Sequence, residues 1–253
     1  MRTKARKMFY RARGYYTGNL NSEAFRLDPY HSKFWREAGD GTWEPETFKV
    51  LDKFLTPDSD YLDIGAWIGP TVLYGARRAR QVYCFEPDPT AFRHLAWNLD
   101  LNGIRNVSAF GVALSDRFGV ARMASTRGEP GDSTSSLLHD ADHGTDALTI
   151  AWDQFEATND LSGVTLVKVD IEGAEFFVLP TLVPWLKTHK PALFLSLHAP
   201  LLPDHDKQKA TKTLLDLLAF YPSISDQNLQ PVTADQLLEP DALSRFQTVL
   251  LHG

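Results

Sequence analysis

Residues 166–175, with the sequence LVKVDIEGAE, bring acidic side chains and a lysine into one short stretch. Lys168 and Asp170 alternate with apolar residues, so on a strand they would share one face, and a buried lysine there needs a nearby acid. Asp170 would end the strand, Glu172 would follow in the turn, and Glu175 would fall in the first turn of a helix, where the dipole favours an acid. Carboxylates held in this way can accept the proton of an attacking hydroxyl.

A histidine ends the next apolar run, 192–197, and supplies a further candidate base. His198 would face the same cleft as Asp170 if the two runs form neighbouring parallel strands, whose carboxyl ends meet at one edge of a sheet. Asp170, Glu172 and His198 also offer the oxygen and nitrogen ligands that divalent metals take. Their spacing does not require a metal, so no metal ligand is assigned and the choice of base stays open.

A glycine turn earlier in the chain is typical of nucleoside-binding folds. Residues 63–69 read DIGAWIG, in which Gly65 permits a sharp turn after a strand and Gly69 allows a helix to approach closely. A dinucleotide-binding turn has the pattern GxGxxG, because its backbone must approach a pyrophosphate. The middle glycine is absent here, and Ala66 and Trp67 fill the turn. The pattern therefore favours a nucleoside ligand without a pyrophosphate.

A carboxylate at the end of the following apolar run fits the same ligand. Glu86 lies 23 residues after Asp63, near the spacing of about 20 residues at which an acid binds the ribose in nucleotide-binding folds. A carboxylate accepts two hydrogen bonds, and a ribose diol donates two. Capping of the helix expected from Pro89 onward is the alternative role for Glu86.

The elements that must position these residues alternate along the chain. Short apolar runs predict strands over 60–64, 81–85, 107–113, 165–169, 192–197 and 247–251, with a short strand and helix over 148–155. Helical periodicity predicts helices over 44–55, 69–78, 89–102, 174–186 and 206–220. This alternation predicts an α/β fold with a doubly wound, mostly parallel sheet of about seven strands and helices on both faces.

The chain divides by composition into two parts. Residues 43–253 carry the alternating pattern and form the expected Rossmann-like domain. Residues 1–42 are basic and aromatic, and we expect a helical extension that packs on this domain. Within the extension, residues 1–14 carry six basic side chains and no acid. We expect a solvated terminal helix there, and weak contact to an acidic membrane surface or a partner is the alternative.

Charge and composition disfavour several classes of protein. The chain has 253 residues with a net charge of −6, and the part beyond residue 14 carries −12, which disfavours nucleic-acid binding. No apolar run approaches the roughly 20 residues that span a bilayer. The single cysteine, Cys84, excludes an internal disulfide, and the first residues lack the apolar core of a signal peptide. We therefore expect a cytoplasmic protein.

Several of these motifs together resemble the FkbM family of class I methyltransferases, from about residue 43 to residue 198. The resemblance rests on DIGAWIG at 63–69, FEPD at 85–88, NGIRNV at 102–107, GVALSD at 111–116 and, most specifically, LVKVDIEGAE at 166–175. The segment GDSTSSL at 131–137, inside a long polar loop over 126–145, resembles a serine-rich loop of the family. We interpret that loop as a lid or an edge of the donor pocket.

The resemblance implies S-adenosylmethionine as the methyl donor and S-adenosylhomocysteine as the product. The donor-binding residues that it implies are Asp63, Gly65, Ala66, Trp67 and Gly69 near the amino acid part, Glu86 and Pro87 near the ribose, Ala113 near the adenine, and Asp170 beside the methyl group. Asp170, Glu172, His198 and Lys168 form the expected catalytic group. The family also implies O-methylation, so the expected acceptor is a hydroxyl of a sugar or another polyhydroxylated small molecule or glycoconjugate.

Three other interpretations stay open. An NAD-dependent oxidoreductase would share the strand and turn pattern, but the absent middle glycine disfavours it. A non-catalytic nucleoside-binding protein would keep the pocket without turnover, and an RNA methyltransferase is disfavoured by the acidic body. A homo-oligomer is compatible with the sequence.

Overall fold

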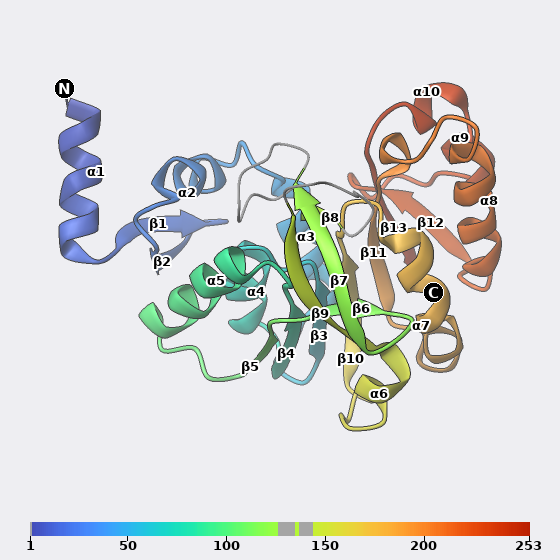
Figure 1. Cartoon of the computed structure of the whole chain (residues 1–253), viewed down its shortest axis with the longest axis horizontal. Helices are drawn as coiled ribbons and strands as arrows, with labels where there is room; N and C mark the ends of the chain where they lie inside the picture. The colour runs from blue at the N-terminus through green and yellow to red at the C-terminus, as the bar shows by residue number, and fades with distance from the viewer. Residues whose placement is uncertain (1, 126–134, 137–143) are drawn as a thin grey trace.

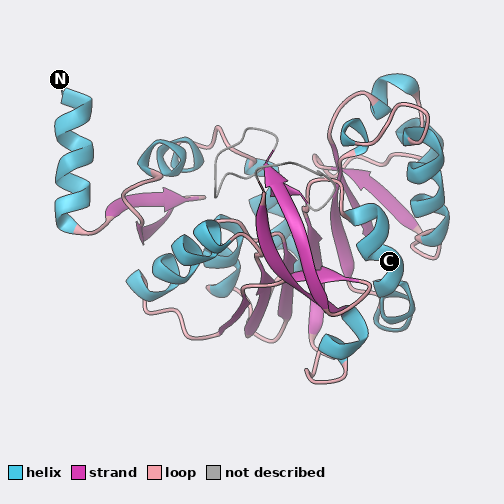
Figure 2. Ribbon diagram, in the orientation of Figure 1, coloured by secondary structure: helices cyan, strands magenta, loops and turns pink. Residues whose placement is uncertain are grey.

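A seven-stranded sheet forms the centre of the computed structural model, which describes residues 2–125, 135–136 and 144–253 (Figures 1 and 2). The strands lie in the order β12-β13-β11-β10-β3-β4-β5. Their bounds are β3 Asp60–Ile64, β4 Gln81–Phe85, β5 Val107–Phe110, β10 Val164–Val169, β11 Ala192–Leu197, β12 Ser223–Asp226 and β13 Gln247–His252. Strands β5, β4, β3, β10 and β11 are parallel, and β13 runs antiparallel to both of its neighbours. The predicted α/β fold with a mostly parallel sheet is confirmed.

Helices cover both faces of this sheet, because the central strands bury apolar side chains on each side. In β3, Tyr61 packs in one hydrophobic cluster, whereas Leu62 and Ile64 pack in another. The first cluster includes residues of α3 Pro45–Phe54, α4 Pro70–Ala76 and α5 Pro89–Leu101. The second includes residues of α6 Trp152–Glu156, α7 Glu175–His189 and α8 Lys207–Leu217. Burial on both faces explains why these strands read as continuous apolar runs.

The N-terminal segment departs from the helical extension that we expected. Helices α1 Arg2–Arg13 and α2 Ser32–Gly39 flank an antiparallel hairpin of β1 Tyr16–Leu20 and β2 Glu23–Leu27. Phe25 of β2 and Trp35 of α2 are buried in the same cluster as α3, α4 and α5, so the hairpin and α2 pack on the domain. Helix α1 stands apart at the edge of the molecule (Figure 1). The division at residue 43 stays a prediction.

A second, smaller sheet corrects two strand predictions. The predicted strand over 107–113 ends at Phe110, and Ala113–Ser115 forms β6 in a sheet ordered β6-β9-β7-β8. The remaining strands are β7 Gly119–Ser125, β8 Ser135–Ser136 and β9 Thr145–Ala151. The strand expected near residue 148 therefore belongs to this small sheet, and the seventh central strand is β12, which was not predicted. The predicted lid over 126–145 lies largely outside the described residues.

The chain ends in short elements around β12 and β13. A 3-10 turn, η1 Ala199–Leu201, follows β11, and α9 Ala234–Leu237 and α10 Pro240–Leu243 lie between β12 and β13.

Among the described helices, none combines the length and the apolarity needed to cross a bilayer.

Candidate active site

The carboxyl ends of β3, β4, β10 and β11 open into a cavity of about 570 Å³. Small-molecule sites commonly have volumes of about 300–1,000 Å³. The cavity lies at the point where the strand order reverses, between β3 and β10, which is where ligands bind in open α/β sheets. Most predicted site residues line it: Gly65, Ala66, Trp67, Glu86, Pro87, Ala113, Lys168, Asp170, Glu172 and His198. Two predicted residues are not among the lining residues: Asp63, which is fully buried next to Lys168, and Gly69, which is the N-cap of α4.

The glycine turn after β3 is fixed by close contact with the end of β10. Gly65 has φ +92°, and a Cβ built there would lie 1.9 Å from the backbone oxygen of Asp170. Trp67 adopts φ +49°, which is uncommon for a residue with a side chain. Its N–H donates to Oε2 of Glu86 at 2.7 Å. The turn therefore joins the first two strand ends into one wall of the cavity.

Glu86 is held by backbone groups and does not cap the following helix. Its two carboxylate oxygens accept hydrogen bonds from the N–H groups of Trp67 and Asp88, at 2.7 and 2.8 Å. The side chain of Asp88 caps α5 instead, so the alternative role predicted for Glu86 is wrong. Burial raises the pKa of Glu86 to about 7, although both backbone hydrogen bonds oppose this shift. Each carboxylate oxygen keeps lone pairs that a ligand hydroxyl can use.

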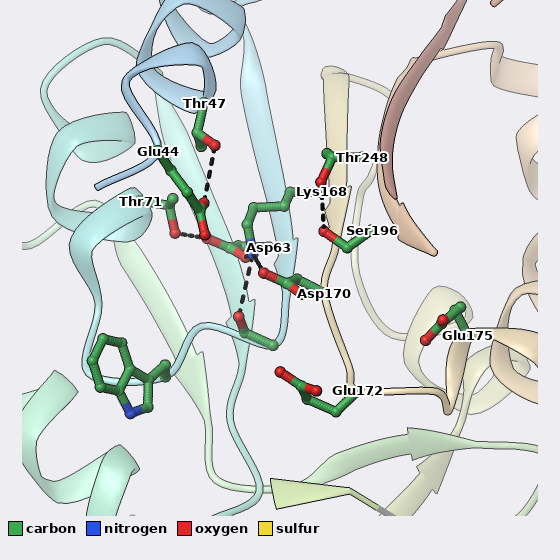
Figure 3. A network of polar contacts seen from close by, with 12 residues as sticks. Glu44, Thr47, Asp63, Thr71, Lys168, Asp170, Glu172, Glu175, Ser196 and Thr248 are labelled. Atoms are coloured by element: carbon green, nitrogen blue, oxygen red, sulfur yellow. Dashed lines mark hydrogen bonds and ion pairs between the residues drawn. The ribbon is translucent and has the colours of Figure 1, made fainter. Parts of the chain in front are cut away.

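Lys168 lies between two carboxylates inside the cavity wall (Figure 3). Its Nζ is 3.5 Å from Oδ1 of Asp63 and 3.3 Å from Oδ2 of Asp170, and it donates to the backbone oxygen of Gly65 at 3.4 Å. Asp63 also accepts hydrogen bonds from Thr71 and Tyr61 at 2.5 and 2.9 Å. Burial alone would lower the pKa of Lys168, but the charges of Asp63 and Asp170 raise it above its usual value. Lys168 is therefore held in its charged form. The nearby acid that the sequence analysis expected is present as Asp63 and Asp170.

His198 lies among three carboxylates. Its Nδ1 is 3.3 Å from Oε1 of Glu175, and its Nε2 is 3.5 Å from Oδ1 of Asp170 and 3.8 Å from Oε2 of Glu172. Burial would lower the pKa of His198, but the hydrogen bond and charge of Glu175, with the charges of Asp170 and Glu172, raise it to about 9. The imidazole is thus protonated at neutral pH in the protein alone, which weakens the prediction that His198 is the base.

Glu175 has a role in this site that the sequence did not indicate. It is fully buried, and its Oε1 also accepts the backbone N–H of His198 at 2.7 Å. Its Oε2 accepts the N–H of Gly173 at 2.8 Å. The helix-dipole explanation that we gave for an acid at this position is therefore incomplete, because the carboxylate also orients the His198 ring.

Glu44 is a further carboxylate that sequence reasoning missed. It lines the cavity, and its carboxylate points toward Asp63 and Asp170 (Figure 3). Its backbone is left-handed, with φ +39°, directly before α3, yet its side chain does not cap that helix. Instead it accepts a hydrogen bond from Thr47 at 3.1 Å. Loss of hydration and the charge of Asp170 raise the pKa of Glu44.

Aromatic side chains form the outer wall of the cavity. Phe34 packs edge-on against Trp43 and Trp67, with ring centres 5.0 and 4.6 Å apart. Phe246 packs against His198 on the other side, at 5.2 Å. Trp43 also contacts Phe48 of α3, at 6.0 Å, so it stabilises the entry into that helix as well as lining the cavity.

The sheet order, the single antiparallel strand and the cavity at the strand ends define a class I methyltransferase fold. Residues 63–214, more than half of the chain, match the sequence profile of the Methyltransferase FkbM domain. The chain belongs to this family of methyltransferases, as its motifs predicted. Membership favours a methyltransferase over the NAD-dependent oxidoreductase. No sequence among curated proteins matches the chain.

Several solved structures to which the chain is similar, at low sequence identity, are methyltransferases by name. The methyltransferase FkbM of Methylobacillus flagellatus KT is 18% identical with a TM-score of 0.48, over 78% of this chain and 44% of that protein. A rRNA methylase of Streptococcus thermophilus is 10% identical with a TM-score of 0.45, over 81% of this chain and 93% of that one. The tRNA (uracil-54, C5)-methyltransferase of Pyrococcus abyssi, in complex with S-adenosyl-L-homocysteine, is 14% identical with a TM-score of 0.45, over 94% and 44%. This chain thus spans less than half the length of the first and third.

Proposed function

We propose that this protein transfers a methyl group from S-adenosylmethionine to a hydroxyl of a sugar or another polyhydroxylated small molecule or glycoconjugate. The observation that carries the proposal is the single cavity in which the glycine turn, the buried Glu86 and the carboxylates at the ends of β10 and β11 meet. When bound, the donor supplies an electrophilic methyl group on a positively charged sulfur.

The residues of the cavity fit this donor. Glu86 has lone pairs left for a ribose diol, and Ala113, Leu114 and Met123 offer an apolar surface for a flat base. The region around Asp170 and Glu172 is rich in carboxylates, which favours a cationic sulfonium over a neutral ligand. Gly65 keeps the turn free of a side chain where the chain passes closest to Asp170.

Other lining residues of the cavity fit a polyhydroxylated acceptor. Phe34 and Trp43 present ring surfaces on one side, and on the other side lies Phe246; Ser196 and Thr248 add hydroxyls to the lining. Sugars combine an apolar C–H face with hydroxyls, so they can use both kinds of surface. The acceptor oxygen bonds to the methyl carbon as the carbon–sulfur bond breaks, and the hydroxyl proton passes to a carboxylate of the site. We assign this proton to Glu44, because Asp170 is paired with Lys168, whereas loss of hydration raises the pKa of Glu44 and so favours its protonated form.

Calorimetric titration with S-adenosylhomocysteine tests the donor assignment. We expect one molecule to bind per chain, whereas NAD in a parallel titration should not bind. Binding of NAD in place of S-adenosylhomocysteine would turn the assignment to an oxidoreductase. Clear binding of S-adenosylhomocysteine without product from any of a panel of sugars would favour the non-catalytic nucleoside-binding protein.

The variant Glu86→Gln should weaken donor binding by about tenfold or more, because a neutral amide accepts the ribose hydroxyls less strongly than a carboxylate. In the parent, affinity should rise as the pH increases through about 7, where Glu86 loses its proton in the free protein. Ligand hydroxyls favour the ionised form, so binding should release protons in this range. Calorimetry in buffers of different ionisation enthalpy measures both effects. As a control, Glu37→Gln, at an exposed position, should leave the donor affinity and its pH dependence unchanged. If Glu86→Gln kept the pH dependence of the parent, the ribose assignment would be contradicted.

The variant Glu44→Gln should lower kcat by about 10²-fold or more, since it removes the proton acceptor, while donor affinity stays unchanged. The matched control is Glu46→Gln, in the first turn of α3, whose carboxylate lies 3.8 Å from Nζ of Lys49 and does not line the cavity. Release of S-adenosylhomocysteine with an active sugar from the panel measures turnover, and calorimetry measures donor affinity. Equal loss of activity in both variants would indicate a structural effect on α3.

A further inference from the structure

Three side chains at the ends of β10 and β11 converge on one point of the cavity. Asp170, Glu172 and His198 each direct one ligand atom to within 4.8 Å of the others. We infer that these residues bind a divalent first-row transition ion, of the type of Mn²⁺ or Zn²⁺, on the acceptor side of the site. The chemical role of the ion rests on the proposed methyl transfer, whereas its binding does not.

The distances among these atoms suit metal ligands better than hydrogen-bonded partners. The Nε2 of His198 lies 3.5 Å from Oδ1 of Asp170 and 3.8 Å from Oε2 of Glu172. N–H···O hydrogen bonds span about 2.7–3.2 Å, so both separations are longer. Two ligands held about 2.1 Å from one ion at a tetrahedral angle lie roughly 3.4 Å apart. The distance to Asp170 matches this spacing. The distance to Glu172 would match it after the Glu172 side chain moved by roughly a few tenths of an ångström.

A buried carboxylate orients the histidine from behind. Metal-binding histidines usually donate their second ring N–H to a carboxylate or carbonyl, which fixes the ring and its tautomer. Here Glu175, fully buried, lies 3.3 Å from Nδ1 of His198 and is itself held by the N–H groups of His198 and Gly173. The Nε2 atom is therefore directed at Asp170 and Glu172. This arrangement gives the buried Glu175 a function in the site.

The two carboxylates line the cavity and are partly exposed there. Oδ2 of Asp170 contacts Lys168 at 3.3 Å, which leaves Oδ1 on the side of His198. Glu172 adopts a left-handed backbone with φ +50°, a strained conformation of the kind that collects at functional sites. The side chains of Asp170 and Glu172 are 28% and 17% exposed. Three protein ligands would leave coordination positions for water and for an acceptor hydroxyl, as in catalytic metal sites.

The donor set indicates which ions fit. Ca²⁺ and Mg²⁺ prefer all-oxygen surroundings, whereas an imidazole nitrogen with carboxylates suits Mn²⁺, Fe²⁺ or Zn²⁺. An ion here would bind the acceptor oxygen and lower the pKa of its hydroxyl. The released proton would go to Glu44, and the methyl carbon would pass from sulfur to that oxygen, which balances the transfer.

A second group of similar composition provides an internal control. Asp28, His31 and His94 also lie within 4.8 Å of one another. There, Oδ1 of Asp28 already accepts hydrogen bonds from the N–H groups of Tyr30 and His31 and contacts Nδ1 of His31, all at 2.8–3.0 Å. Its Oδ2 accepts from Trp35 at 2.9 Å. We assign this group a structural role, because its carboxylate is fully engaged and ties the N-terminal segment to α5.

Titration of the chelator-treated, donor-free protein with MnCl₂ and ZnCl₂ tests the inference. Calorimetry, with the loss of the free Mn²⁺ paramagnetic resonance signal, should show one ion bound per chain. His198→Gln should abolish this binding, and Glu175→Gln should weaken it by about 10–100-fold. His94→Gln should leave the affinity unchanged.

Absence of binding in the unmodified protein would overturn the inference without any variant. Equal affinity in the parent and in Asp170→Asn, a variant of unchanged shape, would overturn it as well. Titration with S-adenosylhomocysteine in the same preparation separates the two proposals. Donor binding without metal binding refutes only the metal site, and metal binding without donor binding refutes only the proposed methyl transfer.

Discussion

The variant Lys168→Met is expected to lower the free energy of unfolding by about 3–5 kcal/mol, because it leaves a buried charge without its partner. Asp63 would be affected most, because its side chain is completely inaccessible to solvent and water cannot replace the lost charge. Its Oδ1 lies 3.5 Å from Nζ of Lys168. Asp170 loses the same neighbour at 3.3 Å. Urea denaturation followed by circular dichroism measures the change.

Two further variants separate the buried pair from lysine loss in general. Lys207→Met removes an ion pair whose carboxylate, on Asp204, is 96% exposed, and such solvent-screened pairs contribute little to stability. The double variant Lys168→Met/Asp63→Asn should regain part of the stability, because the uncompensated charge is gone. If Lys168→Met and Lys207→Met proved equally stable, the Asp63 carboxyl would have to be neutral in the native protein.

The sequence was sufficient for the centre of the sheet because burial on both faces leaves an unmistakable pattern. The predicted bounds of β3, β4 and β11 agree with the structure residue for residue. The pattern failed where only one face or one edge is buried. Strand β12 lies at the edge of the sheet, and its sequence, SISD, contains a single buried residue. The hairpin β1–β2 buries alternate residues within a polar, aromatic segment that we expected to be helical.

The part of the candidate site that lies at the strand ends was predictable, because the fold topology alone brings those residues together. Parallel strands bring their carboxyl ends to one edge, so Glu86, Asp170 and His198 could be placed together before their contacts were known. Glu44 and Glu175 could not, because each depends on a contact between segments far apart in sequence. Glu175 orients a histidine 23 residues away, and Glu44 reaches the cavity only through an irregular backbone before α3. Local propensity carries no information about such contacts.

The sharp turn after β3 was predictable from its glycines. A substitution in this turn should therefore have a large effect on donor binding and on stability. Gly65→Ala should abolish donor binding and lower stability by more than the roughly 1–2 kcal/mol that a left-handed backbone costs an alanine. The added Cβ would meet the backbone oxygen of Asp170 at 1.9 Å. The backbone there cannot retreat easily, because the N–H of Asp170 donates to Ile64 of β3 at 2.9 Å. Thermal unfolding and calorimetry with S-adenosylhomocysteine measure the two losses.

Two other glycines distinguish steric conflict from backbone strain. Gly103→Ala has the same kind of backbone, with φ +62°, but open space around the new Cβ, so it reports the strain alone. Gly69→Ala, with φ +96°, would meet a terminal methyl of Leu95 at 2.6 Å, and a side chain can move where a backbone cannot. Destabilisation should therefore increase from Gly103→Ala through Gly69→Ala to Gly65→Ala, with donor binding lost in the last. Gly65→Ala could instead match Gly103→Ala in both thermal stability and donor affinity. The ends of β3 and β10 would then have to separate readily. In that case the close contact between the glycine turn and Asp170 would not determine the shape of the donor side of the cavity.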